Sequence, residues 1–94
     1  HFYLLTIISV YMPQVKIYST TTCPYCKMLK SYLQEKGVAY EDVLLDEQPD
    51  QIQKSIDTCG SQGVPCTHII KDDGTEVSIM GFDKPKINEA LGLA

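Results

Sequence analysis

The amino-acid sequence predicts an α/β domain in which a four-stranded mixed sheet is flanked by three helices, in the order strand, helix, strand, helix, strand, strand, helix. Short runs of β-branched and aromatic residues alternate with segments of helical periodicity. Pro and Gly residues mark the boundaries between these segments. A chain of 94 residues, 44% of them hydrophobic, suffices for one compact domain and leaves no room for a second.

The first half of the chain predicts a strand, a helix and a second strand. Residues 15–19 (VKIYS) and 39–45 (AYEDVLL) are rich in β-formers. Between them, Pro24 suits the first position of a helix and Gly37 suits its end. Because two strands joined through a helix lie parallel with a right-handed connection, we expect these two to pair in that way.

A second helix is expected from Pro49 to about Cys59, closed by Gly60. Its apolar stripe is formed by Ile52, Ile56 and Cys59, which are spaced i, i+4 and i+7. This stripe predicts that Cys59 is a buried core thiol.

A hairpin and a last helix are expected at the carboxyl end. Residues 67–71 and 75–80 flank Asp73-Gly74, a dipeptide that supplies the positive φ angles of a tight turn between antiparallel strands. The helix starts near Pro85 and has one apolar stripe, made of Ile87, Ala90 and Leu91.

The amino end differs from the rest, so we divide the chain into an apolar extension (residues 1–13) and a domain (residues 14–94). The eleven residues from Phe2 to Met12 are too few to cross a bilayer, which needs roughly 20 in a helix. They also lack the basic flank and the cleavage site of a secretory signal. We expect Met12 to be a natural start; an extra edge strand, a hydrophobic dimer contact and an interfacial anchor are the alternatives.

Composition narrows the class of function. The net charge is −4 and the cationic side chains are eight Lys with no Arg, which argues against nucleic-acid partners. Four Cys occur in a chain that has enough apolar residues for its own core, so we expect the thiols to do chemistry.

The motif Cys23-Pro24-Tyr25-Cys26 lies where the first strand leads into the first helix. A helix N-terminus offers N–H groups without partners and a partial positive charge, which favour the thiolate of Cys23 over the thiol. The Lys27 ammonium acts in the same direction. We expect Cys26 to lie one turn deeper and to stay protonated.

These environments predict a division of labour. Cys23 attacks an external disulfide as a thiolate, and Cys26 resolves the mixed disulfide by attacking Cys23. Half of a zinc site is the alternative reading of the motif, but Cys59 and Cys66 are not spaced as a matching pair, and the two His are His1 and His68. Cys66 is left open between an ordinary strand residue and a neighbour of the active loop, and His68 is expected to be an ordinary strand residue.

From Val15 to Leu93 the sequence resembles the glutaredoxin family. Three motifs in the family's order carry the resemblance, namely Cys23-Pro24-Tyr25-Cys26, Gly63-Val64-Pro65 and Gly81-Phe82-Asp83. The resemblance implies a thioredoxin-like fold in which Pro65 is cis and Val64 presents its N–H and C=O to a bound peptide or to glutathione. Pro24, Tyr25, Lys27 and Pro65 would support the active site, and the implied substrate-binding residues are Tyr25, Val64, Pro65, Gly81 and Asp83.

Some positions depart from the family pattern. Glutathione-using members usually carry a Lys three residues before the first active Cys, where this chain has Thr20. Only Gly81 and Asp83 match the usual Gly-Gly-x-Asp-Asp run. Asp83 either accepts a hydrogen bond from the glutathione α-amino group or caps the last helix, and capping is the preferred interpretation. The Gly81-Phe82 pair followed by Pro85 also looks like the ribonucleotide-reductase-associated redoxins, which take electrons from thioredoxin reductase.

The sequence therefore predicts a small dithiol oxidoreductase that reduces protein or glutathione mixed disulfides through Cys23 and Cys26. We expect no tightly bound cofactor, glutathione as co-substrate with thioredoxin reductase as the alternative reductant, disulfide-containing proteins as partners, and a cytoplasmic location. An iron–sulfur scaffold with Cys23 as ligand and a non-catalytic binding module are the alternatives of other classes.

Overall fold

The computed structural model describes residues 13–93 and contains the predicted order of strands and helices. The elements are β1 (Gln14–Ser19), α2 (Pro24–Glu35), β2 (Glu41–Leu44), the short 3-10 helix η1 (Pro49–Gln51), α3 (Ile52–Cys59), β3 (Cys66–Ile70), β4 (Glu76–Met80) and α4 (Lys84–Leu91). Each predicted boundary lies within a few residues of an observed one.

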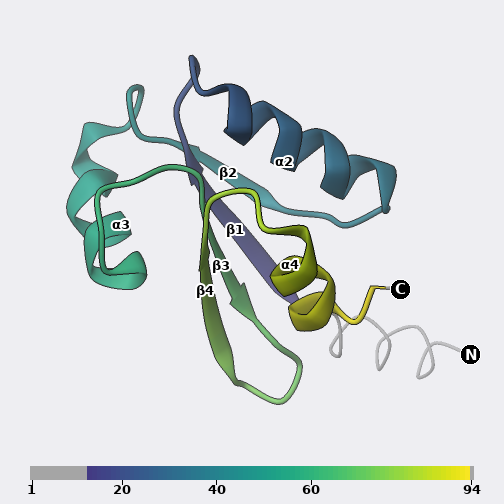
Figure 1. Cartoon of the computed structure of the whole chain (residues 1–94). Helices are drawn as coiled ribbons and strands as arrows, with labels where there is room; N and C mark the ends of the chain where they lie inside the picture. The colour runs from purple at the N-terminus through teal and green to yellow at the C-terminus, as the bar shows by residue number, and fades with distance from the viewer. Residues whose placement is uncertain (1–12, 94) are drawn as a thin grey trace, which may run out of the picture.

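The strands form one four-stranded mixed sheet in the order β2-β1-β3-β4 (Figure 1). β1 and β2 are parallel, with Tyr18 opposite Val43, whereas β1–β3 and β3–β4 are antiparallel. The β3–β4 hairpin turns at Gly74, whose φ of 89° confirms the need for a residue that tolerates positive φ. Because β1 is central, its end is held by strands on both sides.

Each face of the sheet has its own core. Successive strand residues point to opposite faces, so Ile17 and Tyr18 belong to different clusters. The Ile17 cluster packs against α2 and α4, where Ile87 is fully buried and Ala90 and Leu91 are partly buried, as predicted. The cluster of Tyr18, Val43, Leu45 and Cys66 lies on the α3 side. The active-site helix α2 thus rests on one face, and α3 on the other (Figure 1).

The expected apolar stripe of α3 is wrong in part. Ile52 is 42% exposed and Ile56 is half-buried, whereas Ser55 is the buried residue of this helix. Cys59 is not a buried core thiol but forms a disulfide with Cys66. Helical periodicity could not indicate this, because the partner comes from a strand that the fold brings beside the helix end.

The interpretations of the amino-terminal extension fall on residues 1–12, which lie outside the described residues. Within residues 13–93, the longest apolar helical stretch falls short of what a membrane crossing requires.

The buried hydroxyl of Thr67 allows a test of how an unpaired polar group affects the stability of the core. It is fully buried in β3, and its hydroxyl has no hydrogen-bond partner within residues 13–93. A buried hydroxyl without a partner costs about 1–3 kcal/mol, so we expect Thr67→Val to raise the free energy of unfolding by about 1 kcal/mol. Urea unfolding followed by circular dichroism measures this as a higher midpoint with an unchanged slope. A lower midpoint would mean that the hydroxyl contributes a bond.

Candidate active site

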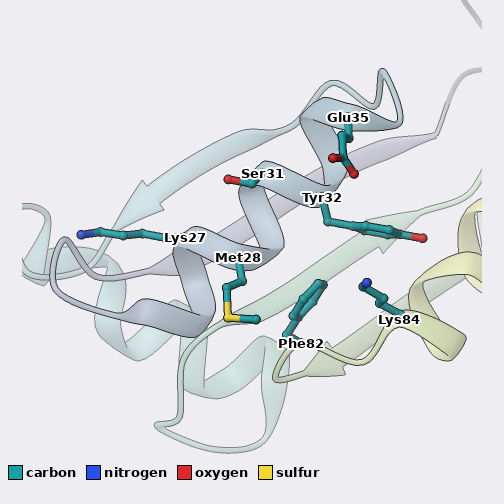
Figure 2. A pocket seen from close by; sticks show the side chains of 7 residues that line it. All are labelled: Lys27, Met28, Ser31, Tyr32, Glu35, Phe82 and Lys84. Atoms are coloured by element: carbon teal, nitrogen blue, oxygen red, sulfur yellow. The ribbon is translucent and has the colours of Figure 1, made fainter.

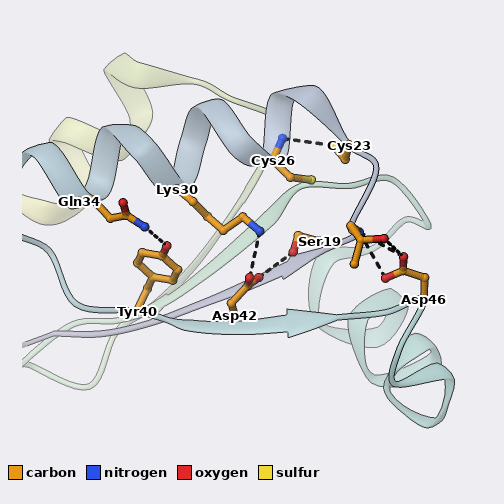
Figure 3. Close-up of polar contacts among 9 residues, drawn as sticks. Ser19, Cys23, Cys26, Lys30, Gln34, Tyr40, Asp42 and Asp46 are labelled. Atoms are coloured by element: carbon orange, nitrogen blue, oxygen red, sulfur yellow. Dashed lines mark hydrogen bonds and ion pairs between the residues drawn. The ribbon is translucent and has the colours of Figure 1, made fainter.

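Cys23 occupies the N-cap position of α2, directly before Pro24. Its backbone is extended, with φ −91° and ψ 113°, so the side chain folds back over the first turn. There its Sγ accepts the backbone N–H of Cys26 at an N···S distance of 3.1 Å (Figure 3). Pro24 has no N–H that would need a partner, so it suits the next position. The expected contact between the Cys23 sulfur and the helix amides is therefore present.

Cys26 lies in the first turn of α2 and is fully buried, whereas Cys23 is partly exposed. Burial raises the pKa of the Cys26 thiol to about 12, and its side-chain hydrogen bond to Cys23 acts in the same direction. The contrast in exposure agrees with the predicted division of labour between a reachable sulfur and a protected one.

A polar network lies one helical turn beyond Cys26. The Lys30 Nζ is 2.9 Å from Asp42 Oδ2 in β2, and the other oxygen of Asp42 accepts the Ser19 hydroxyl at 2.6 Å. Cys26 and Lys30 lie on the same side of α2 (Figure 3). A backbone hydrogen bond with Thr20 and, after it, the Lys30 charge lower the pKa of Cys26, opposing the effect of burial. Sequence reasoning missed this network; the i, i+4 spacing of Cys26 and Lys30 was the available signal.

Asp46 holds the loop that leads to Cys23. Its carboxylate accepts both the backbone N–H of Thr21, at 3.2 Å, and the Thr21 hydroxyl. The hydroxyl bond, followed by backbone N–H bonds, holds the pKa of Asp46 below its usual value. Asp46 was not predicted. Its position after β2, next to the end of the parallel strand β1, is where α/β sheets gather functional groups.

The Val64–Pro65 bond is cis, as the resemblance implied. The C=O of Pro65 accepts the N–H of Gly81 at 2.8 Å, which brings the second and third predicted motifs together. In the described chain, neither backbone group of Val64 bonds to another backbone group. These groups are available to an added strand.

Asp83 caps α4, since its Oδ1 accepts the N–H of Lys86 at 3.2 Å. This confirms the preferred interpretation of Asp83. The neighbouring Gly81 adopts φ 76°, which turns the chain from β4 toward the cap.

A groove of about 320 Å³ opens beside the active loop. Among the residues 13–93 that line the groove, the one charged side chain is the Asp46 carboxylate, and none is a cation. The remaining lining residues are Thr20, Leu45, Ile52, Gln62 and Val64. The groove thus joins the Cys23 loop, through Thr20, to the Val64 segment.

Large apolar side chains are exposed around the motif: Tyr25 is 63% exposed and Met28 is 49% exposed. Lys27, predicted as a support for Cys23, is also exposed and lines a hollow of about 380 Å³ between α2 and the segment that leads into α4. Figure 2 shows Met28 facing Phe82 across this hollow. The structure gives the Lys27 side chain no hydrogen bond or ion pair within residues 13–93. Its predicted role stays a prediction.

The family model for glutaredoxin matches residues 15–73. The chain belongs to the glutaredoxin family. It is 35% identical over 77 residues to a glutaredoxin-like 8.6 kDa protein in the rubredoxin operon of Clostridium pasteurianum, covering 82% of this chain and 96% of the relative. It is 39% identical over 59 residues to the glutaredoxin-like protein NrdH of Lactococcus lactis, covering 63% of this chain and 78% of the relative.

Solved glutaredoxin structures share the fold. The crystal structure of Methanosarcina acetivorans methanoredoxin superposes with a TM-score of 0.69 at 32% identity, covering 84% of each chain. Membership of the glutaredoxin family supports thiol–disulfide oxidoreductase activity, and the family generally works without a tightly bound cofactor. Within residues 13–93, no group of three or more His, Cys, Asp or Glu side chains is placed to hold a metal ion.

The Lys30 charge can be tested in a Cys23→Ser background, where Cys26 is the thiol of the motif that remains. We expect Lys30→Met to raise the pKa of Cys26 further and to reduce its thiolate about three- to tenfold at a given pH. The rate of alkylation of Cys26 by iodoacetamide, measured by mass spectrometry, reports the fraction of Cys26 that is a thiolate. This rate rises with pH at pH values below the pKa of Cys26. Lys54→Met is the matched control, because it removes the same charge from exposed α3. Equal shifts in both variants would contradict the role of Lys30.

Proposed function

We propose that this glutaredoxin-family protein reduces disulfides in partner proteins, with Cys23 as nucleophile and Cys26 as resolving thiol. The Cys23 thiolate attacks one sulfur of the substrate; the substrate S–S bond breaks, one half leaves as a thiolate that takes up a proton, and the other half stays on Cys23. Cys26 then loses its proton and attacks the Cys23 sulfur. The second half leaves as a thiol, so two electrons pass to the substrate and a Cys23–Cys26 disulfide remains.

The observation that carries this proposal is the 3.1 Å contact from the Cys26 N–H to the Cys23 Sγ. A backbone N–H that points at a sulfur stabilises negative charge there. The two cysteines lie at the start of the same helix, with Cys23 at the N-cap and Cys26 in the first turn. The hydrogen bond to Cys23 also helps to keep Cys26 protonated until Cys23 has been consumed.

Cys23 reacts before Cys26 because the charge on Cys23 affects the pKa of Cys26. While Cys23 is a thiolate, its charge adds to burial in raising the pKa of Cys26. Once Cys23 carries a substrate sulfur, that charge is gone, whereas the Lys30 charge remains. Cys26 therefore becomes easier to ionise at the point in the cycle where it is needed.

The groove favours a polypeptide over glutathione as the molecule that binds beside Cys23. Glutathione carries two carboxylates, but the described lining of the groove offers the Asp46 carboxylate and no cation. One oxygen of Asp83, Oδ1, is engaged in capping α4. Exposed Tyr25, Met28 and Ile52 instead suit contact with another protein. We therefore infer that a protein such as thioredoxin reductase is the reductant, with glutathione as the alternative.

A trapping experiment tests the mechanism. We expect Cys26→Ser to accumulate a stable mixed disulfide on Cys23 when it meets a protein disulfide, because the resolving thiol is missing. Intact-mass and peptide mass spectrometry locate the adduct, and Cys23→Ser is the control that should form none at this motif. Failure of Cys26→Ser to form an adduct on Cys23 would refute the assignment.

Two coupled assays of NADPH oxidation test the reductant, one through thioredoxin reductase and one through glutathione and glutathione reductase. We expect the first to be about two- to fivefold faster, since the exposed Asp46 carboxylate in the groove disfavours the carboxylates of glutathione. Thr20→Lys supplies a cation to the groove and should raise the glutathione-dependent rate selectively. A wild-type protein turned over faster by glutathione would contradict the inference.

A further inference from the structure

The structure pairs the cysteines that the proposed mechanism does not use. Cys59 and Cys66 form a disulfide with a Cα–Cα distance of 6.4 Å, while Cys23 and Cys26 are free. Cys59 is the last residue of α3, and Cys66 is the first residue of β3. The bond therefore closes the segment 60–65, which contains Val64 and Pro65.

This segment forms one wall of the groove beside Cys23, through Gln62 and Val64. Its noncovalent restraints are few. The Gly63 N–H donates to the Ser61 hydroxyl at 3.1 Å within the segment, the Ser61 hydroxyl contacts Met80 Sδ in β4 at 3.9 Å, and the Pro65 C=O accepts the Gly81 N–H. In the part of the chain that the structure describes, Gln62 and Val64 have no backbone–backbone hydrogen bonds. A covalent link across the ends limits the conformations open to such a segment more than these bonds do.

The two sulfurs have unequal access to solvent. Cys66 is fully buried with Tyr18, Val43 and Leu45, whereas Cys59 is only partly buried at the helix end. An external thiolate must therefore attack Cys59 and expel Cys66 as a thiolate into apolar surroundings, which solvate the charge poorly. A second thiol of the reductant then releases Cys59, which leaves two thiols on this chain and a disulfide in the reductant. We expect this reduction to be slower than that of a Cys23–Cys26 disulfide.

We propose that the Cys59–Cys66 disulfide is a second redox site, which fastens the Gln62–Val64 wall of the groove and thereby determines how well polypeptide substrates bind beside Cys23. The proposal rests on the proposed function. It separates two properties: Cys23 supplies the reactivity toward any disulfide, and the fastened wall supplies affinity for extended peptides. Small disulfides that do not use the Val64 backbone are unaffected by the link.

The first measurement is a count of thiols under native conditions. Oxidised protein treated with a limiting amount of dithiothreitol should gain two thiols per chain, mapped by alkylation and mass spectrometry to Cys23 and Cys26, with the Cys59–Cys66 peptide still linked. Reduction of Cys59–Cys66 first, or its absence from protein purified without reductant, would overturn the proposal.

The second measurement compares wild type with Cys59→Ala/Cys66→Ala in single-turnover reactions of the pre-reduced protein. For a peptide disulfide, we expect the half-saturating concentration to rise about three- to tenfold, the size expected from ordering one or two side chains on binding. The rate constant with hydroxyethyl disulfide should stay within about twofold, because the helix N-terminus of α2 is unchanged. Hydrogen exchange of residues 60–65 should become faster.

Val15→Ala is the matched control, since it weakens the core cluster on the opposite sheet face and leaves the disulfide in place. It should lower stability without moving the peptide half-saturation or the exchange of 60–65. Unchanged peptide binding and exchange in Cys59→Ala/Cys66→Ala would refute the proposal. Loss of reactivity toward both substrates in the wild type would instead refute the proposed function, and the exchange measurement would still decide the role of the disulfide.

Discussion

The proposed chemistry depends on the position of one sulfur, the Cys23 Sγ, at the start of α2. The Cys23 Sγ accepts an N–H from the first turn of α2, which lets the helix act on the charge of that atom. The position is held from outside the motif, because the preceding loop is bonded to Asp46 through Thr21. Asp46 follows β2, and β2 pairs in parallel with β1. The position of the Cys23 sulfur is therefore determined jointly by the β1–β2 pairing, by the loop before Cys23 and by α2.

The two cysteines of the motif share a helix turn but differ in solvation. Cys23 is partly exposed, and Cys26 is buried with its pKa raised to about 12. Burial is the main cause of this raised pKa, and a backbone hydrogen bond with Thr20 and, after it, the Lys30 charge act in the opposite direction. Lys30 is itself paired with Asp42, and this ion pair is only partly buried, with the two side chains 17% and 28% exposed.

In the proposed function, substrate recognition uses a groove next to the loop that leads to Cys23. Thr20, in the loop before Cys23, lines the groove together with Gln62 and Val64. Among its described lining residues, the one charged side chain is the Asp46 carboxylate, and none is a cation. The Cys59–Cys66 disulfide connects the Gln62–Val64 wall to the Tyr18 core cluster, so that the covalent link and the hydrophobic core position the same wall.

Local sequence determined the elements and the motif: Pro24 began α2, Gly74 turned the hairpin and Asp83 capped α4, because each depends on residues close by in the chain. The cis bond before Pro65 came from family resemblance rather than from local chemistry. Tertiary structure alone decided that Cys59 bonds to Cys66, that Asp46 holds the Thr21 loop, and that Lys30 pairs with Asp42. Each of these contacts joins different elements, and their distances follow from sheet order and helix packing, which periodicity along the chain does not specify.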